Sequence, residues 1–461
     1  MSERPDVIVV GGGIAGITAS IELAREGVRV LLLETRKKLG GRATSHTDQK
    51  TGETIDNCQH VALGCCTNYL RLCELLGVLD RIEWQRTIHW YEAGGVRSDM
   101  APSDWAPAPG HYGWSLLTAS FLDFEEKTAL TGAMLAALAC DRRRHTDRTF
   151  DDWLRERGQS RRLIERFWVP VMVSACNVLP ERLCASVGLH VLQEGFLAHR
   201  DSAAMGVSRV PLVELYDRAE GVIAGAGGAM RLGTGVGEVH ERHVVTTGGE
   251  TIGAGRVVCA LPAERAAKVI AVEDARVRAM ARVEHSPILG VHLKFDRPVM
   301  EKPNAVLVGR ATHWLFRKDH AGAHAHAVIS GADAWMGMNE EAIVAKVLGD
   351  VHACIPSSES ARVTWARAVK EKRATFVPSI EAERERPGTL GGSSLVLAGD
   401  FVQTGWPATM EGATRSGLMA ASAVLGEDVR ARLVPALTPA WPVRLLGGPT
   451  LRRQHERPIT A

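Results

Sequence analysis

A glycine-rich turn between a short apolar strand and a helix constrains the fold of this chain more than any other feature. Residues 7–10 (Val-Ile-Val-Val) are all β-branched, which is typical of a buried parallel strand. The turn follows at 11–16, and the apolar spacing predicts a helix over 14–25 and a second buried strand over 28–33. Strand, helix and strand together form a βαβ unit. The chain is therefore predicted to be an α/β protein with a Rossmann-like domain.

The three glycines of this turn have the spacing of a dinucleotide-binding motif. Gly11 permits the tight turn, Gly13 lets a pyrophosphate approach the backbone, and Gly16 lets the helix pack on the strand. The helix start directs unpaired N–H groups at that phosphate. An acidic residue at the end of the second strand binds the hydroxyls of an adenosine ribose. The predicted dinucleotide contacts in this unit are Gly11, Gly13, Ile14, Ala15, Gly16, Glu34 and Thr35.

A second glycine pair makes the ligand more specific. In Gly40-Gly41-Arg42 the glycines let the chain double back along a dinucleotide, and the arginine supplies a fixed positive charge for its pyrophosphate. NAD enzymes do not need this addition, so the sequence favours FAD. With these residues the chain resembles the superfamily of FAD-binding amine oxidases and phytoene desaturases.

The resemblance extends to a motif near the C-terminus. A predicted strand over 395–398 ends in Gly399-Asp400, and residues 404–413 (Thr-Gly-Trp-Pro-Ala-Thr-Met-Glu-Gly-Ala) lead into a helix. The resemblance implies that Asp400 binds the ribityl chain and pyrophosphate, that this helix start faces the flavin pyrimidine ring, and that Val239 contacts adenine. An ordinary edge strand is the alternative for Val239. The FAD contacts implied beyond the first unit are Gly40, Gly41, Arg42, Val239, Gly399, Asp400, Ala408, Thr409 and Met410.

Composition and cysteine usage exclude several other classes of protein. Of the 461 residues, 45% are hydrophobic and 23% are charged, and the formal net charge of +2 gives no electrostatic argument for a nucleic-acid partner. The nine cysteines include no Cys-x-x-Cys pair, which predicts free thiols in a reducing cytosol and no metal site. No cysteine follows Cys354, so the tether of covalent amine oxidases is missing. The FAD is therefore predicted to be bound non-covalently.

The order of the predicted elements indicates two domains built from separate segments. One is an FAD-binding domain of the amine-oxidase and GDI type, and the other is an α+β substrate domain. In chain order the predicted segments are 1–100 (FAD-binding), 101–205 (substrate, helical), 206–288 (FAD-binding), 289–388 (substrate, antiparallel sheet and helix), 389–428 (FAD-binding) and 429–461 (tail).

One stretch narrows the resemblance within the superfamily. Residues 56–68 follow the Gly-Gly-Arg segment and would pass beside the flavin. Together with 404–413 they resemble the squalene-associated flavoproteins of bacteria, the hydroxysqualene dehydroxylases of hopanoid and triterpene biosynthesis. The resemblance implies that a C30 isoprenoid loses an allylic hydroxyl as water, and that reduced FAD supplies hydride to give squalene. These motifs do not identify the electron donor of the flavin.

Three alternatives stay open. Carotenoid-type polyene desaturases and flavin amine oxidases share these motifs but remove hydride from their substrates. Paired tyrosines beside the flavin would favour an amine oxidase, whereas this chain has four tyrosines and none near Gly405. A prenyl-binding escort protein on the same fold, such as a Rab GDP-dissociation inhibitor, is the non-enzyme alternative. Such proteins lack the complete set of FAD motifs that this chain keeps.

The catalytic candidate is a histidine in the stretch beside the flavin. His60 titrates near neutrality when unperturbed, so it is the predicted proton donor for the leaving hydroxyl, with a structural hydrogen-bonding role and a solvent-facing role as the alternatives. Asp56 is predicted to bind a turn or the backbone. Glu411 is predicted to interact with the N-terminus of its own helix, with Arg415 as its partner.

A C30 isoprenoid is insoluble, so the protein is predicted to be cytoplasmic and to touch the inner face of the cytoplasmic membrane without crossing it. Residues 129–139 are the candidate apolar helix, followed by Arg142-Arg143-Arg144 for anionic headgroups. Trp441 and Leu445-Leu446 form a second candidate. The alternative is a core helix followed by a solvated basic turn.

Overall fold

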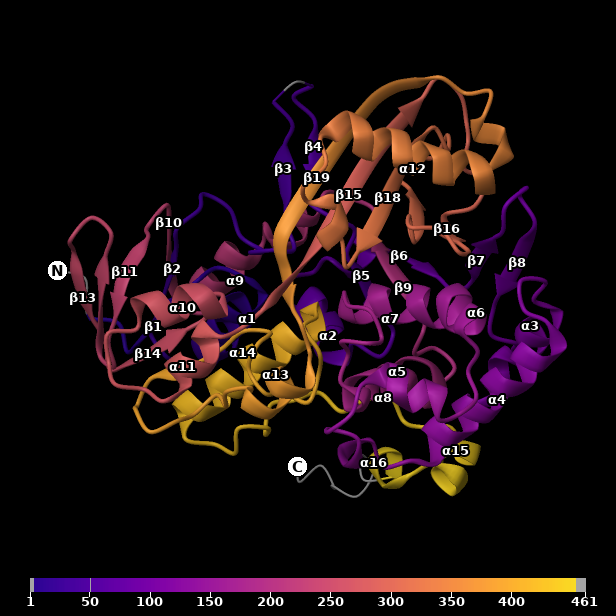
Figure 1. Ribbon diagram of the computed structural model, residues 1–461. Helices are drawn as coiled ribbons and strands as arrows, with labels where there is room; N and C mark the ends of the chain where they lie inside the picture. Colours follow the sequence, from indigo (N-terminus) through magenta and orange to yellow (C-terminus); the bar gives the residue numbers. More distant parts are fainter. Residues whose placement is uncertain (1–3, 50, 453–461) are drawn as a thin grey trace.

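A parallel sheet lies at the centre of one half of the molecule (Figure 1). The computed structural model describes residues 4–49 and 51–452. The sheet has the order β10-β2-β1-β14-β20, and all of its pairings are parallel. Its strands are β1 (Val7–Val10), β2 (Val30–Glu34), β10 (Ala229–Leu232), β14 (Arg256–Cys259) and β20 (Val396–Leu397). Strands β10, β14 and β20 come from parts of the chain far from β1 and β2. Folding therefore brings three distant segments together in this parallel-sheet region.

Two helices from opposite ends of the chain pack together against this sheet. They are α1 (Ile14–Arg25), with the predicted bounds, and α14 (Met410–Leu425). A Cβ atom added to Gly417 would lie 2.4 Å from the carbonyl oxygen of Ala15, so the close approach of the helices requires glycine there. Other helices around this sheet are α2 (Thr67–Leu75), α9 (Ala219–Gly225), α10 (Ala263–Val269), α11 (Arg276–Ala281) and α13 (Ile380–Glu385).

A seven-stranded sheet forms the second half, in the order β19-β15-β18-β17-β16-β7-β8. Helix α12 (Glu340–Cys354) covers its outer face (Figure 1). Alternate residues such as Leu289, Val291 and Leu293 are buried under that helix, as the period of two of a strand requires. The strands are β7 (Ile88–Tyr91), β8 (Arg97–Met100), β15 (His285–Phe295), β16 (Asn304–Leu307), β17 (Trp314–Arg317), β18 (His324–Ser330) and β19 (Val363–Phe376).

The sheet corrects two expectations from the sequence. Residues 88–100 were expected in the first FAD-binding segment, but β7 pairs in parallel with β16, so the predicted boundary at residue 100 is too late. Strand β19 was not predicted. Charged residues between 367 and 373 interrupt its apolar alternation, and it is half-buried along most of its length.

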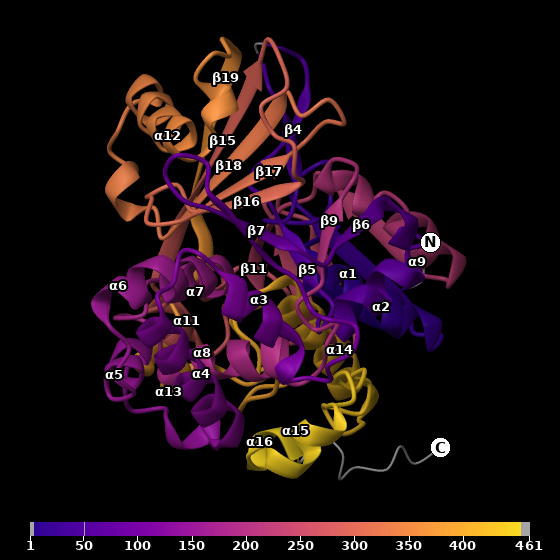
Figure 2. The same ribbon diagram turned by 90° about the vertical axis from the view of Figure 1, so that its right-hand side faces the viewer.

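Helices fill the space beneath the inner face of this sheet (Figures 1 and 2). Two helices of the predicted tail join this helical layer, since Val443 and Leu451 are buried in the same core as α4. Residues 453–461 of the tail lie outside the described residues. The helices of the layer are α3 (Gly113–Thr118), α4 (Phe124–Ala139), α5 (Phe150–Arg155), α6 (Arg161–Leu163), α7 (Val169–Cys176), α8 (Ala185–Leu192), α15 (Trp441–Leu446) and α16 (Pro449–Arg452).

The described residues show neither a membrane-spanning helix nor a group of metal ligands. Among the residues described, no helix is long and apolar enough to cross a bilayer, and no three or more His, Cys, Asp or Glu side chains are grouped as metal ligands. All nine cysteines are free thiols.

In the part of the chain that the structure describes, three small sheets lie outside the two large ones. They consist of β3 (Ser45–Thr47) with β4 (Thr54–Asp56), of β5 (Val61–Leu63) and β6 (Ile82–Gln85) on either side of β9 (Met205–Ser208), and of β11 (Val236–Val239), β12 (His243–Thr246) and β13 (Thr251–Gly253).

Candidate functional site

Glycine backbone forms a cradle at the start of α1. Gly11 has φ +111°, and a Cβ there would lie 2.7 Å from the carbonyl oxygen of Ala260. A Cβ on Gly16 would lie 1.8 Å from the carbonyl oxygen of Gly11, so helix and turn touch backbone to backbone. Gly13 caps the helix without a side chain. The first N–H groups of α1 are therefore left to bind a phosphate, as predicted for this motif.

The second glycine pair closes this cradle. Gly40 and Gly41 both have positive φ, and the Gly40 N–H donates to the Gly12 carbonyl at 2.9 Å. A Cβ on Gly41 would lie 3.1 Å from the Cα of Gly13. Side chains at these positions would fill the space that a pyrophosphate needs, so the residues present fit the predicted FAD.

Glu34 lies at the edge of the cradle. Its carboxylate accepts hydrogen bonds from the backbone N–H groups of Gly12 (2.6 Å) and Arg36 (2.7 Å). Thr35 follows it and is exposed. Glu34 thus lies at the predicted end of β2 and stabilises the glycine turn, and its contact with ribose stays a prediction.

An ion pair joins the two motifs that the sequence places 358 residues apart. The guanidinium of Arg42 donates to the Asp400 carboxylate, and its other terminal nitrogen donates to the carbonyl of Ala374 at 3.1 Å. Burial alone would lower the pKa of Arg42, but the neighbouring Asp400 charge raises it overall. Asn57 donates from its side chain to the Arg42 carbonyl at 2.7 Å. The N-terminal, C-terminal and flavin-adjacent segments therefore meet at Arg42.

The start of α14 lies beyond this pair. Gly399 has φ +145° and donates its N–H to the Ser416 hydroxyl at 2.8 Å, which ties the end of β20 to the helix. Thr409 is the N-cap, and its hydroxyl accepts from the Gly412 N–H at 3.1 Å. Ala408 and Met410 on either side are half-buried. Contacts of these residues with the flavin ring stay predictions.

Glu411 binds a second helix in addition to lying at the start of its own. Its carboxylate accepts from the Asn68 side chain (2.6 Å) and the Tyr69 N–H (2.8 Å) at the start of α2. Glu411 thus lies in the first turn of its own helix, as predicted, and tertiary packing adds the start of a second helix as its hydrogen-bonding partner. Arg415 is the expected partner at 3.8 Å, and burial raises the pKa of Glu411.

Val239 is fully buried in β11. Its carbonyl accepts the N–H of Ala271 at 2.9 Å. An ordinary strand residue makes the same kind of hydrogen bond. The contact of Val239 with adenine stays a prediction.

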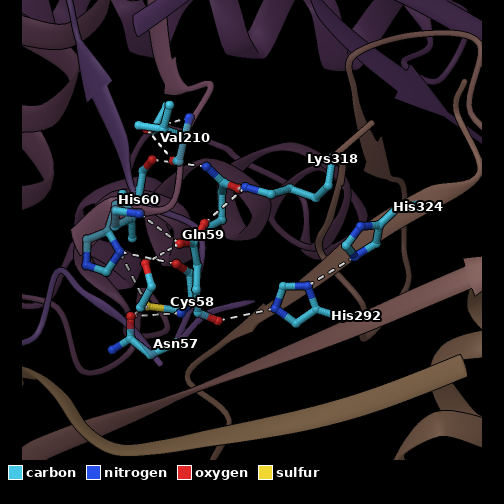
Figure 3. Close-up of polar contacts among 12 residues, drawn as sticks. Asn57, Cys58, Gln59, His60, Val210, His292, Lys318 and His324 are labelled. Carbon is cyan, nitrogen blue, oxygen red and sulfur yellow. Dashed lines mark hydrogen bonds and ion pairs between the residues drawn. The ribbon is translucent and has the colours of Figure 1, made fainter. Parts of the chain in front are cut away.

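The segment after Asp56 folds back on itself (Figure 3). The Nδ1 atom of His60 lies 3.3 Å from the Cys58 carbonyl oxygen and 3.6 Å from the Cys58 sulfur. Because a carbonyl only accepts, Nδ1 carries the ring proton. Burial lowers the pKa of His60, so the ring is neutral near pH 7. These contacts match the structural alternative, and the role as proton donor stays a prediction.

Asp56 makes the backbone contact that the sequence predicts. Its carboxylate accepts from the Ser45 hydroxyl (2.8 Å), the Leu212 N–H (2.9 Å) and the Lys318 ammonium (3.1 Å). Burial alone would raise the pKa of Asp56, but Lys318 and the other donors hold it below its usual value. A cavity of about 740 Å³ lies beside this pair, with His292 and His324 also in its wall.

Sequence reasoning missed a group of histidines on the inner face of the seven-stranded sheet. His292 Nε2 lies 3.2 Å from the Asp56 carbonyl oxygen, and its Nδ1 lies 3.3 Å from His324 Nε2 (Figure 3). The ring of His326 stacks on His292 with centroids 3.9 Å apart. A signal was available, because two histidines separated by one residue in a strand share a face.

A sequence profile decides the family. The profile described as flavin containing amine oxidoreductase matches residues 14–425, which include the Arg42–Asp400 pair and the whole of α14. The chain belongs to this family. This flavin-containing oxidoreductase therefore has the predicted FAD cofactor and enzyme class.

Similar proteins cover nearly the whole oxidoreductase. Hydroxysqualene dehydroxylase of Rhodopseudomonas palustris is 28% identical over 442 residues, which covers 91% of this chain and 98% of that protein. A 15-cis-phytoene desaturase of an Oncidium hybrid cultivar is 24% identical over 462 residues, covering 91% and 78%. A putrescine oxidase structure has a TM-score of 0.69 at 14% identity, covering 92% and 99%. The likeness to the putrescine oxidase structure confirms the predicted α/β fold.

Proposed function

We propose that this flavoprotein is a reductive dehydroxylase that converts hydroxysqualene to squalene in hopanoid or triterpene biosynthesis. The observation that carries the proposal is its similarity to a protein named hydroxysqualene dehydroxylase over 91% of this chain and 98% of that relative. The motifs of residues 56–68 and 404–413, which resemble the same enzymes, support it.

The described residues fit a non-covalently bound FAD. The glycine cradle and the start of α1 would hold the pyrophosphate, with Arg42 and Asp400 beside it. All nine cysteines are free, and none follows Cys354. When bound, the flavin supplies the two-electron hydride chemistry of the reaction.

The inner face of the seven-stranded sheet suits a long apolar molecule with one polar group. At one end it presents His292, His324 and Lys294, and the register of β18 and β17 then leads to Val328 and Trp314. Those apolar residues share a core with the helical layer. A polar end next to the flavin segment and an apolar remainder are what a C30 alcohol requires of its site.

The tyrosines give no support to the amine oxidase alternative. Tyr69 and Tyr216 are fully buried with their hydroxyl oxygens 3.4 Å apart, in the core of the parallel-sheet region. Their rings therefore serve packing rather than substrate. The escort alternative is disfavoured because both halves of the flavin site are intact.

The proposal is tested anaerobically. The holoenzyme is reduced with dithionite, in place of the unidentified electron donor, and hydroxysqualene is added. We expect reoxidation of the flavin together with squalene, detected by mass spectrometry. Persistent reduced flavin with unchanged alcohol would reject the proposal, and oxidised enzyme would then be tested with phytoene as a polyene desaturase.

We further propose that the protein contacts the inner face of the cytoplasmic membrane through one surface. Helices α3, α4 and α15 lie along the same side of the molecule (Figures 1 and 2), and Leu138 at the end of α4 accepts the Gly448 N–H after α15. Tryptophan and leucine side chains of this kind favour the membrane interface. The α3–α4–α15 surface is defined by the exposed side chains Trp114, Leu117, Phe124, Leu135, Trp441, Leu445 and Leu446.

The expected basic run contributes less than the sequence suggests. Arg142 turns inward to Glu194 at 2.9 Å, and Arg143 pairs with Asp141 at 2.6 Å. Arg144 and Arg444 are the exposed cations near the α3–α4–α15 surface that suit anionic headgroups.

Flotation with phosphatidylglycerol vesicles tests this surface. The double variant Trp441→Ser, Leu445→Ser should bind vesicles at least about tenfold more weakly, because two large apolar side chains no longer enter the interface. Trp84→Ser on β6 is the control, since Trp84 is also exposed but lies on another sheet. Equal loss in both variants, or no loss in the double variant, would contradict the proposal.

A further inference from the structure

One buried histidine on the inner face of the seven-stranded sheet has no polar partner. His326 is 0% exposed, and neither of its ring nitrogens has a hydrogen-bond partner among the described residues. Buried polar groups are almost always hydrogen-bonded, because leaving them without a partner is costly. An imidazole of this kind therefore points to a polar atom that a ligand supplies.

The position of His326 distinguishes it from two other buried histidines that also lack partners. The ring of His111 is tilted by 48° against Tyr112 in the turn before α3, and His190 packs edge-on against Trp406 with the cations Arg142, Arg386 and Arg415 around it. His326 instead lies on the sheet face that covers the flavin-adjacent segment, since its cross-strand neighbour His292 bonds to the Asp56 carbonyl.

Gly290 on the neighbouring strand β15 has no side chain, which leaves room for the ring of His326. A Cβ added to Gly290 would lie 2.6 Å from His326 Nε2 and 3.4 Å from the Asn57 carbonyl oxygen. The ring thus lies over Gly290, next to Asn57. Asn57 in turn bonds to the carbonyl of Arg42, which is paired with Asp400. Gly290 thus places the His326 ring close to the segment that bonds to Arg42 in the predicted flavin site.

His292 stacks on the ring of His326, and both ring nitrogens of His292 already have partners. His292 Nε2 faces the Asp56 carbonyl, which only accepts, so Nε2 carries the proton and Nδ1 accepts from His324. Its ring stacks on His326 with 13° between the planes. On the other side, the register places Phe316 opposite His326. The His326 ring therefore borders Phe316 and Val328, where the aromatic and aliphatic side chains of this face begin.

We infer that His326 binds the hydroxyl group of the substrate and so places the carbon that carries it next to the flavin. This inference rests on the proposed function. Burial and the nearby His292, Lys318 and His324 hold the pKa of His326 well below its usual value. The ring is thus neutral and offers one N–H donor and one acceptor nitrogen, which complement a hydroxyl without a buried charge.

Binding to the oxidised holoenzyme tests the inference without turnover. Dissociation constants are measured for hydroxysqualene and for squalene, which lacks the hydroxyl. We expect the wild type to prefer the alcohol by about tenfold or more, since the alcohol satisfies a buried donor that squalene leaves unpaired. His326→Phe should bring the ratio close to one while squalene binding stays within about twofold.

Three further variants separate this role from packing. His326→Gln keeps an N–H group near Nε2 and should retain most of the preference. Gly290→Ala should lose it, because the new methyl group displaces the ring, and this variant stands in if His326→Phe does not fold. His111→Phe replaces another buried histidine without partners and should leave the ratio unchanged.

The outcomes also separate the inference from the proposed function. A folded, flavin-loaded His326→Phe that keeps the preference would overturn the inference, as would a wild type that converts hydroxysqualene without preferring it. A wild type that neither binds nor converts the alcohol would instead overturn the proposed function.

Discussion

The parallel-sheet region and the seven-stranded sheet present their functional groups in opposite ways. Around Gly11 and Gly41 the backbone itself forms the site, and side chains are absent because they would fill it. On the inner face of the seven-stranded sheet the groups are side chains, and Gly290 matters because it leaves room for His326. The cofactor end of this enzyme therefore depends on main-chain geometry, and the proposed substrate end depends on side chains from neighbouring strands.

The largest effect is expected where backbone meets backbone. In Gly16→Ala the new methyl carbon would lie 1.8 Å from the Gly11 carbonyl oxygen, so α1 has to move away from β1. We expect protein without bound flavin and a free energy of unfolding lower by about 3 kcal/mol or more. The flavin-to-protein absorbance ratio and urea unfolding measure both effects.

A second helical glycine is the control for that substitution. Gly349 in α12 has no atom within 4 Å of its added Cβ. Gly349→Ala should therefore keep the flavin and gain up to about 1 kcal/mol from helix propensity. Flavin retention in Gly16→Ala would show that the cradle tolerates side chains. It would contradict the conclusion that main-chain geometry forms the cofactor end.

The ion pair between the two flavin motifs should give the next largest effect. Arg42→Ala leaves the buried Asp400 carboxylate without its partner, so we expect the apoprotein to lose about 3 kcal/mol of unfolding free energy. Adding Asp400→Asn removes the unpaired charge and should recover part of that loss in urea unfolding. A double variant as unstable as Arg42→Ala alone would refute this account.

Acid should act on the seven-stranded sheet through its histidines. Burial lowers the pKa of His292 to about 4, so on acidification the unfolded chain takes up the proton first. The stabilisation from this neutral ring is complete above the unfolded pKa of about 6.5 and is lost as the pH falls towards 4, by about 2 kcal/mol between pH 7 and 5. Urea unfolding of His292→Gln should show a pH dependence weaker by that amount. An unchanged dependence would exclude His292 as its source.

Helix caps should give the smallest effects, and one of two matching caps lies at the cofactor end. Thr409→Ala removes the hydroxyl that accepts the Gly412 N–H, and Asn339→Ala removes the matching cap of α12. Each should lose about 1 kcal/mol of unfolding free energy. We expect weaker flavin binding in a titration only for Thr409→Ala, because α14 starts at the predicted flavin ring. Equal flavin affinity in both variants would reject that placement.

Local patterns in the sequence predicted much of the fold. The helix over 14–25 has the predicted bounds, and β20 lies within the strand predicted over 395–398, because each carries a clear apolar pattern. Strand β19 has no such period, since one edge of the sheet leaves it half-buried. Glu411 could not be placed from sequence because the helix start that it binds, at Asn68, lies 343 residues away.

The glycine motifs of the sequence were enough to predict the cofactor end of this protein. A glycine that must adopt positive φ or admit a phosphate leaves the same signal in any chain, so Gly11, Gly16 and Gly41 could be identified without coordinates. The proposed substrate end, in contrast, could be found only from the folded structure. The setting of His326 depends on strand register and on which groups remain without partners, and neither exists before the strands have paired.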